Sequence, residues 1–315
     1  MSLARLSVLR AGPQVTLQDA GRFGLMRYGV PASGPMDRFA FAIANLVLGN
    51  PANAPAIEVS LAGLTLYCAE GPVCLAIAGG DFQVSIDERP VAAWGIFTLY
   101  RGQTLVIRPG RWGNWCYLAT GGKIRHDRWL ESSATHSLSN FGGGRITSET
   151  DLLIDEVRPA LRQPTAVLRP VSARPRPNIK VVLGPQDRFF DAETITRLLA
   201  EPFVLTDAYD RMGVRLSGPS LRPHATLDMP SEGIVRGSIQ VAGDGVATVL
   251  LADHQTTGGY PKIATVLSCD LDGFVQLRSR SRVRFEAVSP EDAIAATRTR
   301  LRSRDAYFST LQTGD

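Results

Sequence analysis

The chain has 315 residues, of which 44% are hydrophobic and 20% are charged, a balance typical of a globular protein with a large core. Its formal net charge is +4, but the arginines are spread along the chain, so the charge pattern argues against a nucleic-acid-binding surface. The start of the chain has no apolar signal segment, and no apolar run is long enough to span a membrane. We therefore expect a cytoplasmic protein without nucleic-acid or membrane partners.

Cysteine and histidine spacing indicates neither disulfides nor a metal site. Cys68, Cys74, Cys116 and Cys269 show no CxxC spacing and lie mostly in apolar runs, so we expect reduced thiols in the core. The four histidines are scattered singly, without HExxH spacing.

Residues 1–157 are expected to form a β-rich N-terminal lobe. A strand is predicted at 6–9, and a helix at 36–48, where Ser33 or Gly34 provides the N-cap and Pro35 lies near the first turn. Short apolar runs then recur about every ten residues, which is typical of an antiparallel barrel or sandwich. The strands predicted there are 58–67, 73–78, 82–86, 94–100, 104–107 and 115–119.

A second β-rich lobe is expected at 179–290, after a Pro- and Arg-rich stretch at 158–178. We interpret that stretch as an extended connector with solvated arginines. The second lobe has a predicted helix at 192–200, and a final helix and tail follow at 291–315, with Pro290 at the first turn. Its predicted strands are 179–184, 203–208, 238–241, 247–252, 263–267 and 283–286.

The polar segment between the predicted strands 247–252 and 263–267 has the composition of a binding loop. Adjacent Gly258 and Gly259 allow positive φ and leave backbone N–H groups accessible to an anion or carbonyl oxygen. Gln255 can donate and accept at once, which suits a ligand with an N–H beside a C=O. A long hairpin loop that satisfies its own backbone is the equally weighted alternative. His254 could act in acid–base chemistry, although a hydrogen-bond donor is the favoured interpretation.

Two arginines in other polar loops are candidates for binding a ligand carboxylate. Arg22 and Arg211 could each form a bidentate pair with it. The alternative, weighted equally, is that each braces its own loop by pairing with Asp19 or Asp210. No GxxxxGK[ST] motif occurs, so the chain shows no standard cradle for ATP.

Four motifs together resemble one known family, the allophanate hydrolase subunit 2 or biotin-dependent carboxyltransferase family. The resemblance covers about residues 5–290 and implies a cyclophilin-like β-barrel architecture, in agreement with the strand-rich pattern. The motifs are Gln18-Asp19-x-Gly21-Arg22-x-Gly24, Gly29-Val30-Pro31-x-Ser33-Gly34-x-Met36-Asp37, Asp210-Arg211-Met212-Gly213 and Gln255-Thr256-Thr257-Gly258-Gly259-Tyr260.

The resemblance also implies an enzyme subunit that is inactive alone and works with a subunit-1-type partner. We expect a subunit of a multi-subunit, ATP-dependent 5-oxoprolinase that hydrolyses 5-oxo-L-proline to L-glutamate, with a third, lactam-binding subunit. We assign the catalytic site to Gln255, Thr256, Thr257, Gly258, Gly259 and Tyr260. We assign substrate binding to Gln18, Asp19, Arg22, Asp37, Asp210, Arg211 and Glu232.

Two other functions are compatible with the resemblance. One is the carboxyltransferase component of a biotin-dependent urea or amide carboxylase; because the chain has no Met-Lys-Met motif, biotin would be on a separate carrier. The other is a non-catalytic regulator that binds the subunit-1 partner. A departure from the family pattern at Leu130-Glu131-Ser132-Ser133-Ala134-Thr135 keeps that option open; this departure and a second one at Glu149-Thr150-Asp151 also bear on whether the usual substrate is kept.

Overall fold

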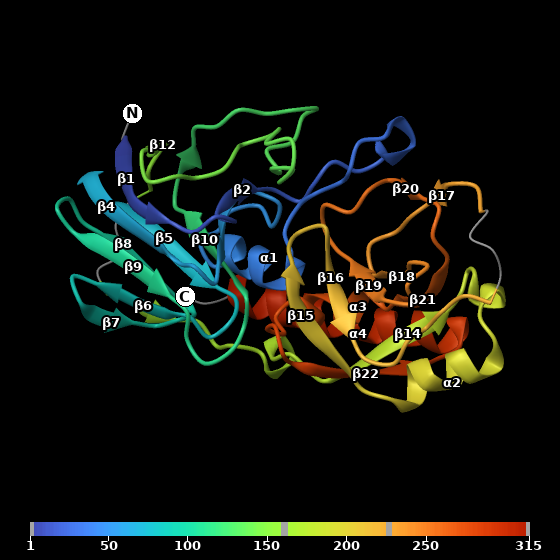
Figure 1. The fold of residues 1–315 in the computed structure, drawn as a ribbon. Coiled ribbons are helices and arrows are strands. Elements are labelled where there is room, and N and C mark those ends of the chain that lie inside the picture. The colour runs from blue at the N-terminus through green and yellow to red at the C-terminus, as the bar shows by residue number, and fades with distance from the viewer. Residues whose placement is uncertain (1–2, 159–162, 225–228, 313–315) are drawn as a thin grey trace. The chain divides into compact units, whose positions relative to one another are not determined.

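The computed structural model describes residues 3–158, 163–224 and 229–312, which form two compact units (Figure 1). Unit 1 comprises residues 1–22, 33–174 and 307–315, and unit 2 comprises residues 23–32 and 175–306. The mainly β architecture with a barrel is confirmed, because two antiparallel sheets build unit 1 and a closed barrel builds unit 2. Within the described residues, the helices are all too short or too polar to cross a membrane.

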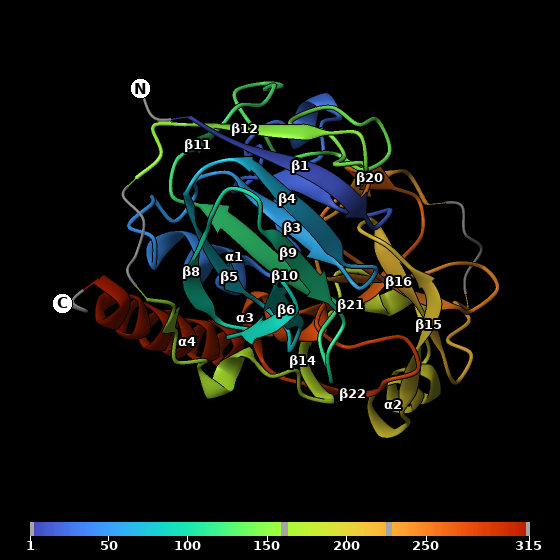
Figure 2. The same cartoon turned by 90° about the vertical axis from the view of Figure 1, so that its left-hand side faces the viewer.

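Unit 1 contains a seven-stranded and a six-stranded sheet, and Figure 2 shows β1, β4 and β9 of the larger sheet side by side. The larger sheet has the order β11 (Lys123–Ile124), β12 (Asp151–Asp155), β1 (Ala4–Ala11), β4 (Leu64–Glu70), β9 (Thr104–Arg108), β6 (Gln83–Ile86) and β7 (Arg89–Val91). The smaller sheet has the order β13 (Thr165–Ala166), β8 (Gly95–Leu99), β5 (Val73–Ala78), β10 (Trp115–Thr120), β3 (Ala56–Ser60) and β2 (Thr16–Gln18).

The core of unit 1 includes apolar side chains from both sheets, such as Leu66 and Ile107 from the larger and Leu75 and Leu118 from the smaller. Every residue of β5 and β10 is buried, because helix α1 (Arg38–Leu46) packs against these strands. The helix is capped by Asp37, whose carboxylate accepts from Ala40 N at 2.9 Å. The predicted cap at Ser33 or Gly34 is therefore wrong, since the carboxylate at Asp37 lies nearer the first turn.

Two other predictions for unit 1 need correction. The strand predicted at 58–67 is two strands in different sheets, β3 and β4, because a turn intervenes in which Gly63 has φ +78°. The stretch 158–178, whose residues 159–162 lie outside the described part, also contains β13, which pairs with β8. Its arginines are not all solvated: Arg158 donates to Leu48 O, and Arg169 pairs with Asp81 at 3.0 Å.

Unit 2 is a seven-stranded barrel that closes through the parallel pair β14–β22 (Figure 1). Its order is β14 (Asn178–Leu183), β21 (Lys262–Val266), β18 (Ser238–Val241), β19 (Ala247–Leu250), β16 (Gly213–Ser217), β15 (Phe203–Tyr209) and β22 (Arg282–Ala287). A two-stranded sheet joins β17 (Glu232–Gly233) to β20 (Thr257–Gly258). The helices of unit 2 are α2 (Ala192–Ala200), α3 (Ser268–Phe274) and the part of α4 (Pro290–Gln312) up to residue 306. The 3-10 turns of the two units are η1 (Met26–Tyr28), η2 (Val171–Ala173) and η3 (Asp187–Phe189).

The start of α4 follows the prediction, and Ser289 provides the cap by accepting from Asp292 N at 3.0 Å. The strands β19 and β21 are not adjacent, because both pair with β18, which lies between them. The chain from β19 to β21 is therefore a crossover past one strand, not a hairpin loop, and the expectation of a glycine turn between adjoining strands is wrong. The polar residues of this crossover lie beside β18 and its neighbours.

Candidate functional site

The crossover between β19 and β21 contains the residues assigned to catalysis from the sequence. Its strand β20 pairs with β17, so that Glu232 lies opposite Gly258 and Gly233 opposite Thr257. Thr256 contributes its carbonyl oxygen, which accepts from Ile234 N at 3.1 Å. The sequence-predicted residues Glu232 and Gly258 are thus brought together by main-chain pairing.

The two glycines are not there for positive φ, and that expectation is wrong: neither has a left-handed backbone. Gly258 is instead closely approached by side-chain ends, because a Cβ there would lie 2.7 Å from Ile234 Cδ1 and 2.8 Å from Gln240 Nε2, and both would have to shift. Gly259 has only ordinary contacts at the same position, the nearest being Met229 O at 3.5 Å. The glycine at 258 therefore lets the main chain lie against a glutamine amide.

That amide belongs to a pair of glutamines from different elements. Gln255 Nε2 donates to Gln240 Oε1 at 3.4 Å, and Gln240 Nε2 donates to the carbonyl oxygen of Tyr260 at 3.3 Å. Gln240 is buried on β18, whereas Gln255 is half-buried in the crossover. These bonds fix the orientation of Gln240, while Gln255 Oε1 has no hydrogen bond within the described chain. An N–C=O ligand could bond to this free edge.

A buried lysine lies next to this pair. Lys262 is opposite Gln240 in the β18–β21 register and is only 2% exposed. Its Nζ has no hydrogen-bond partner among the residues that the structure describes, and Glu232 Oε2 lies 3.8 Å away. A buried ammonium without hydrogen bonds costs folding free energy.

Gln186 connects Lys262 to Glu232. Its Nε2 donates to Glu232 Oε2, and its Oε1 accepts from Lys262 N at 3.0 Å. Gln186 is itself 2% exposed, so its amide is shielded from water. We call Gln186, Glu232, Gln240, Gln255 and Lys262 the glutamine–lysine cluster. It offers amide donors, amide acceptors, one cation and one carboxylate within a single unit.

A pocket of about 530 Å³ opens on the outer face of the barrel beside this cluster. The β16–β19–β18 register places Arg215 opposite Thr248 and Thr248 opposite Gln240, and all three residues line the pocket. Gln255 and the half-exposed Tyr260 also contribute to the wall. We call this space the outer-face pocket; its remaining lining residues are Asp207, Ala208, Tyr209, Asp210, Met212, Gly213, Ala242 and Leu250.

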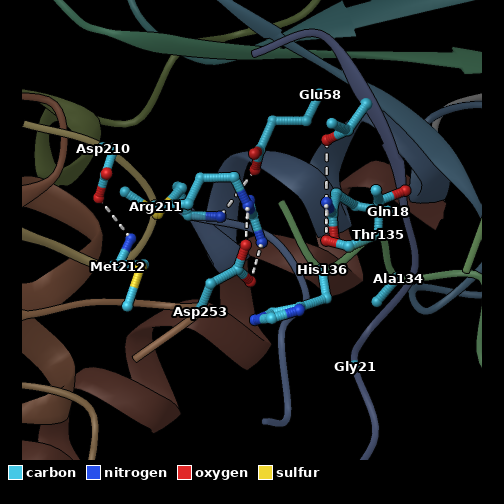
Figure 3. Close-up of polar contacts among 12 residues, drawn as sticks. Gln18, Gly21, Glu58, Ala134, Thr135, His136, Asp210, Arg211, Met212 and Asp253 are labelled. Carbon is cyan, nitrogen blue, oxygen red and sulfur yellow. Dashed lines mark hydrogen bonds and ion pairs between the residues drawn. The ribbon is translucent and has the colours of Figure 1, made fainter. Parts of the chain in front are cut away.

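The segment at 210–215 has a different structure from the polar loop predicted there, because β16 begins at Gly213. Asp210 shapes the turn by accepting from Met212 N at 2.7 Å. Arg211 does not pair with Asp210; it forms a bidentate ion pair with Asp253, at 2.9 Å for both bonds (Figure 3). Both side chains are fully buried. The bracing alternative is thus the better description of Arg211, although its partner comes from the crossover.

His254 also has a structural partner in the crossover. Burial lowers the pKa of His254, so that the ring is neutral near pH 7. Its Nδ1 donates to the carbonyl oxygen of Gln255 at 2.6 Å, in agreement with the favoured interpretation as a hydrogen-bond donor. This bond helps to hold Gln255 in place.

In unit 1, the predicted substrate-binding residues Gln18 and Asp19 organise the segment 132–135. Gln18 Nε2 donates to the carbonyl oxygen of Thr135 at 3.0 Å (Figure 3). Asp19 accepts from Ser132 Oγ at 2.7 Å and from Ser133 N at 2.7 Å. Burial alone would raise the pKa of Asp19, but these bonds outweigh it and hold the pKa below its usual range.

Arg22 and Asp37 of unit 1 likewise have partners within their unit. Arg22 does not pair with Asp19; its guanidinium donates to the carbonyl oxygens of Trp129 and Ala134 and lies 4.8 Å from the Trp129 ring centroid. Asp37 caps α1, and its N–H donates to Tyr117 Oη at 2.7 Å. Direct contact of Gln18, Asp19, Arg22 and Asp37 with a substrate stays a prediction.

Comparison with known proteins supports the resemblance seen in the motifs. The family described as the carboxyltransferase domain, subdomains A and B, matches residues 28–287. The chain belongs to this carboxyltransferase-domain family. The match includes all of the glutamine–lysine cluster and all of the outer-face pocket.

Relatives within the carboxyltransferase-domain family have two kinds of name. The chain is 34% identical to the C subunit of 5-oxoprolinase from Haemophilus influenzae, over 91% of this chain and 93% of that one. It is 31% identical to the Escherichia coli protein of the same name, over 97% of each. A solved structure of the Kluyveromyces lactis urea carboxylase is 25% identical with a TM-score of 0.85; it matches 98% of this chain, which spans 29% of that longer protein.

Sequence reasoning missed Gln186, Gln240 and Lys262 of this carboxyltransferase-domain chain. Lys262 lies two residues after the recognised Gln255–Tyr260 motif, and this position was the one feature of the sequence that could have pointed to it as a site residue. Gln186 and Gln240 lie in unremarkable sequence and join the site only through strand pairing. In the described part of the chain, no group of three or more metal-binding side chains is arranged to hold an ion.

Proposed function

We propose that this chain is a subunit of a multi-subunit, ATP-dependent 5-oxoprolinase that hydrolyses 5-oxo-L-proline to L-glutamate. The observation that carries the proposal is the match, at 31–34% identity over more than nine-tenths of both chains, to two proteins named as the C subunit of 5-oxoprolinase. The glutamine–lysine cluster supports it with chemistry suited to a lactam.

The lactam of 5-oxo-L-proline presents an N–H beside a C=O on one edge. Gln255, oriented by Gln240, can donate to the carbonyl oxygen and accept from the N–H of that edge. Ring opening builds negative charge on the oxygen when water adds to the carbon, and the C–N bond then breaks to release the amine. The buried ammonium of Lys262, held beside Glu232, would stabilise that charge.

The proposed complex has three parts. A subunit-1-type partner and a lactam-binding third subunit would work with this chain. ATP, when the complex binds it, would supply a phosphoryl group that activates the poorly electrophilic lactam, with ADP leaving on transfer and inorganic phosphate leaving when water opens the ring. We assign ATP binding to no residue of this chain.

A second candidate is the carboxyltransferase component of a biotin-dependent urea or amide carboxylase. The observation that favours it is the structural match to a urea carboxylase, together with the description of the family. Urea and the ureido ring of biotin also present an N–C=O edge, so the same glutamine pair would serve. Biotin would be carried by a separate chain.

One reconstitution experiment separates these functions. The chain is purified with its subunit-1 partner, and separately with both that partner and the lactam-binding subunit, and ATP hydrolysis is followed on addition of 5-oxo-L-proline. We expect turnover only in the three-part mixture. Carboxyl transfer from carboxybiotin without that turnover would establish the second candidate instead, and a tight two-part complex without either activity would indicate a regulator.

A further inference from the structure

The outer-face pocket has a charged wall that the glutamine–lysine cluster does not explain. Arg215 is exposed on β16, and its guanidinium has neither an ion pair nor a hydrogen bond within the described residues. The next side chain in the row is the half-buried Thr248, whose hydroxyl also has no bonded partner there. A planar guanidinium beside a hydroxyl provides hydrogen-bond donors for both oxygens of a carboxylate.

The acidic side chains of the same pocket do not neutralise Arg215. Asp210 turns its Oδ1 toward Met212 N and Gly213 N, at 2.7 and 3.2 Å. Asp207 forms no ion pair with any described residue, and it is available as an acceptor for a ligand N–H. The pocket wall therefore presents a cation, Arg215, and an acceptor, Asp207, together with the amide of Gln255.

We propose that the outer-face pocket binds a small ligand carrying a carboxylate next to an amide edge, and that Arg215 selects for the carboxylate. Arg215, Thr248 and Gln240 lie side by side on three neighbouring strands. In this proposal Arg215 and the Thr248 hydroxyl bind the ligand carboxylate, and the amide edge of the ligand lies toward Gln240. This inference rests on the proposed function, since 5-oxo-L-proline has both groups. In this proposal, Arg215 is the residue that makes the pocket bind an anionic lactam in preference to neutral urea.

The experiment compares two ligands and two matched variants. Binding of 5-oxo-L-proline and of pyrrolidin-2-one, the same lactam without the carboxylate, is measured by calorimetry or NMR titration on the complex of this chain with its subunit-1 partner, without the lactam-binding third subunit. The variants are Arg215→Gln and Arg282→Gln; Arg282 is an exposed barrel arginine on β22 that does not line the pocket.

We expect Arg215→Gln to weaken 5-oxo-L-proline binding roughly 10- to 100-fold, the loss typical of a charge-assisted bond. Pyrrolidin-2-one binding should not change, and Arg282→Gln should bind both ligands as the wild type does. Because Arg215 is exposed, the variant should fold normally, which its thermal unfolding curve will show.

The results distinguish this inference from the proposed function. If the wild-type complex opens the lactam but Arg215→Gln binds it equally well, the carboxylate assignment is overturned and the function stands. If binding depends on Arg215 but no lactam is opened, the pocket assignment stands and the function fails. If the wild type does not bind 5-oxo-L-proline, both fail.

Discussion

Lys262 combines deep burial with an ammonium that lacks hydrogen bonds within the described chain. Glu232 at 3.8 Å gives it a counter-charge, but that carboxylate is 43% exposed and thus remains partly solvated. Such an arrangement costs folding free energy, because a partly solvated counter-charge offsets only part of the desolvation of the cation.

Replacing Lys262 by Met should therefore separate activity from stability. We expect 5-oxo-L-proline turnover by the complex to fall by about 10²-fold or more, since a positioned donor to the developing oxyanion is lost. The melting temperature should stay the same or rise, because a buried charge is replaced by an apolar side chain of similar length. Steady-state turnover and thermal unfolding measure the two effects.

Lys123→Met provides the control, because Lys123 is exposed and paired with Glu156 in unit 1. That variant should keep full turnover. A Lys262→Met protein that loses stability strongly would show instead that the lysine is part of the scaffold, and one that retains turnover would remove it from the site.

Single residues also show which parts of the candidate site could not be predicted from the sequence. Gln255 could be proposed as a site residue from the sequence, because its amide lies in a polar, glycine-rich segment with a recognisable motif. Gln240 could not, because Ser238–Val241 is a wholly buried strand whose one amide becomes significant only when Thr248 and Lys262 are placed beside it. The roles of Arg22 and Arg211 were also undetermined, since both partners lie far away in sequence.

At the level of elements, a single carboxylate anchors the segment that departs from the family pattern. Asp19 follows β2 and accepts from Gly21 N at 2.9 Å as well as from Ser132 and Ser133. Leu130 and Glu131 both have positive φ, at 50° and 62°, which costs non-glycine residues energy. The bonds to Asp19 therefore hold in place a turn whose backbone is strained.

Asp19→Ala should destabilise unit 1 by about 1.5–3 kcal/mol at pH 7, the range for hydrogen bonds to a charged group. Because the folded pKa of Asp19 lies below the ordinary value of 3.8, the carboxylate stabilises the fold above that pH. This contribution is lost as the pH falls below 3.8 and passes through the folded pKa. Urea unfolding of the wild type and the variant, measured from pH 7 to below pH 3.8, tests whether the stabilisation by Asp19 is lost in acid.

The stability difference between the two proteins should therefore shrink in acid. A difference that stays constant with pH would show that Asp19 acts through packing rather than charge. Asp87→Ala serves as a comparison, because that turn carboxylate is exposed and accepts a single bond, from Thr104 N at 2.9 Å.

Elements with a regular apolar periodicity could be predicted from the sequence. Elements that form only by pairing with a neighbouring strand could not. The strands Val73–Ala78 and Ser238–Val241 and the helix Ala192–Ala200 have the bounds expected from their patterns. The short strands β7, β13, β17 and β20 have at most three residues each, too few for a period, and exist only because a neighbouring strand pairs with them. The β19–β21 connection could not be distinguished from a hairpin loop in advance, because sequence order does not reveal that β18 lies between the two strands.

At the scale of the whole chain, composition and motifs together indicated the mainly β architecture and the family. The match over residues 28–287 and the two 5-oxoprolinase relatives confirm that family. Composition could not reveal the closed barrel, since closure depends on the parallel pair β14–β22 between strands about a hundred residues apart. The side chains that line the outer-face pocket come from separate strands, so their grouping could not be predicted from the sequence.

The most direct test of the proposed function and its site is 5-oxo-L-proline-dependent ATP hydrolysis by the three-part mixture with wild-type chain, Gln255→Ala and Gln83→Ala. Gln83 is an exposed strand glutamine in unit 1 and controls for the loss of an amide. We predict turnover with the wild type and Gln83→Ala, and a loss of about 10²-fold or more with Gln255→Ala at an unchanged melting temperature. Wild-type turnover by Gln255→Ala would contradict the assignment of the amide edge to this glutamine.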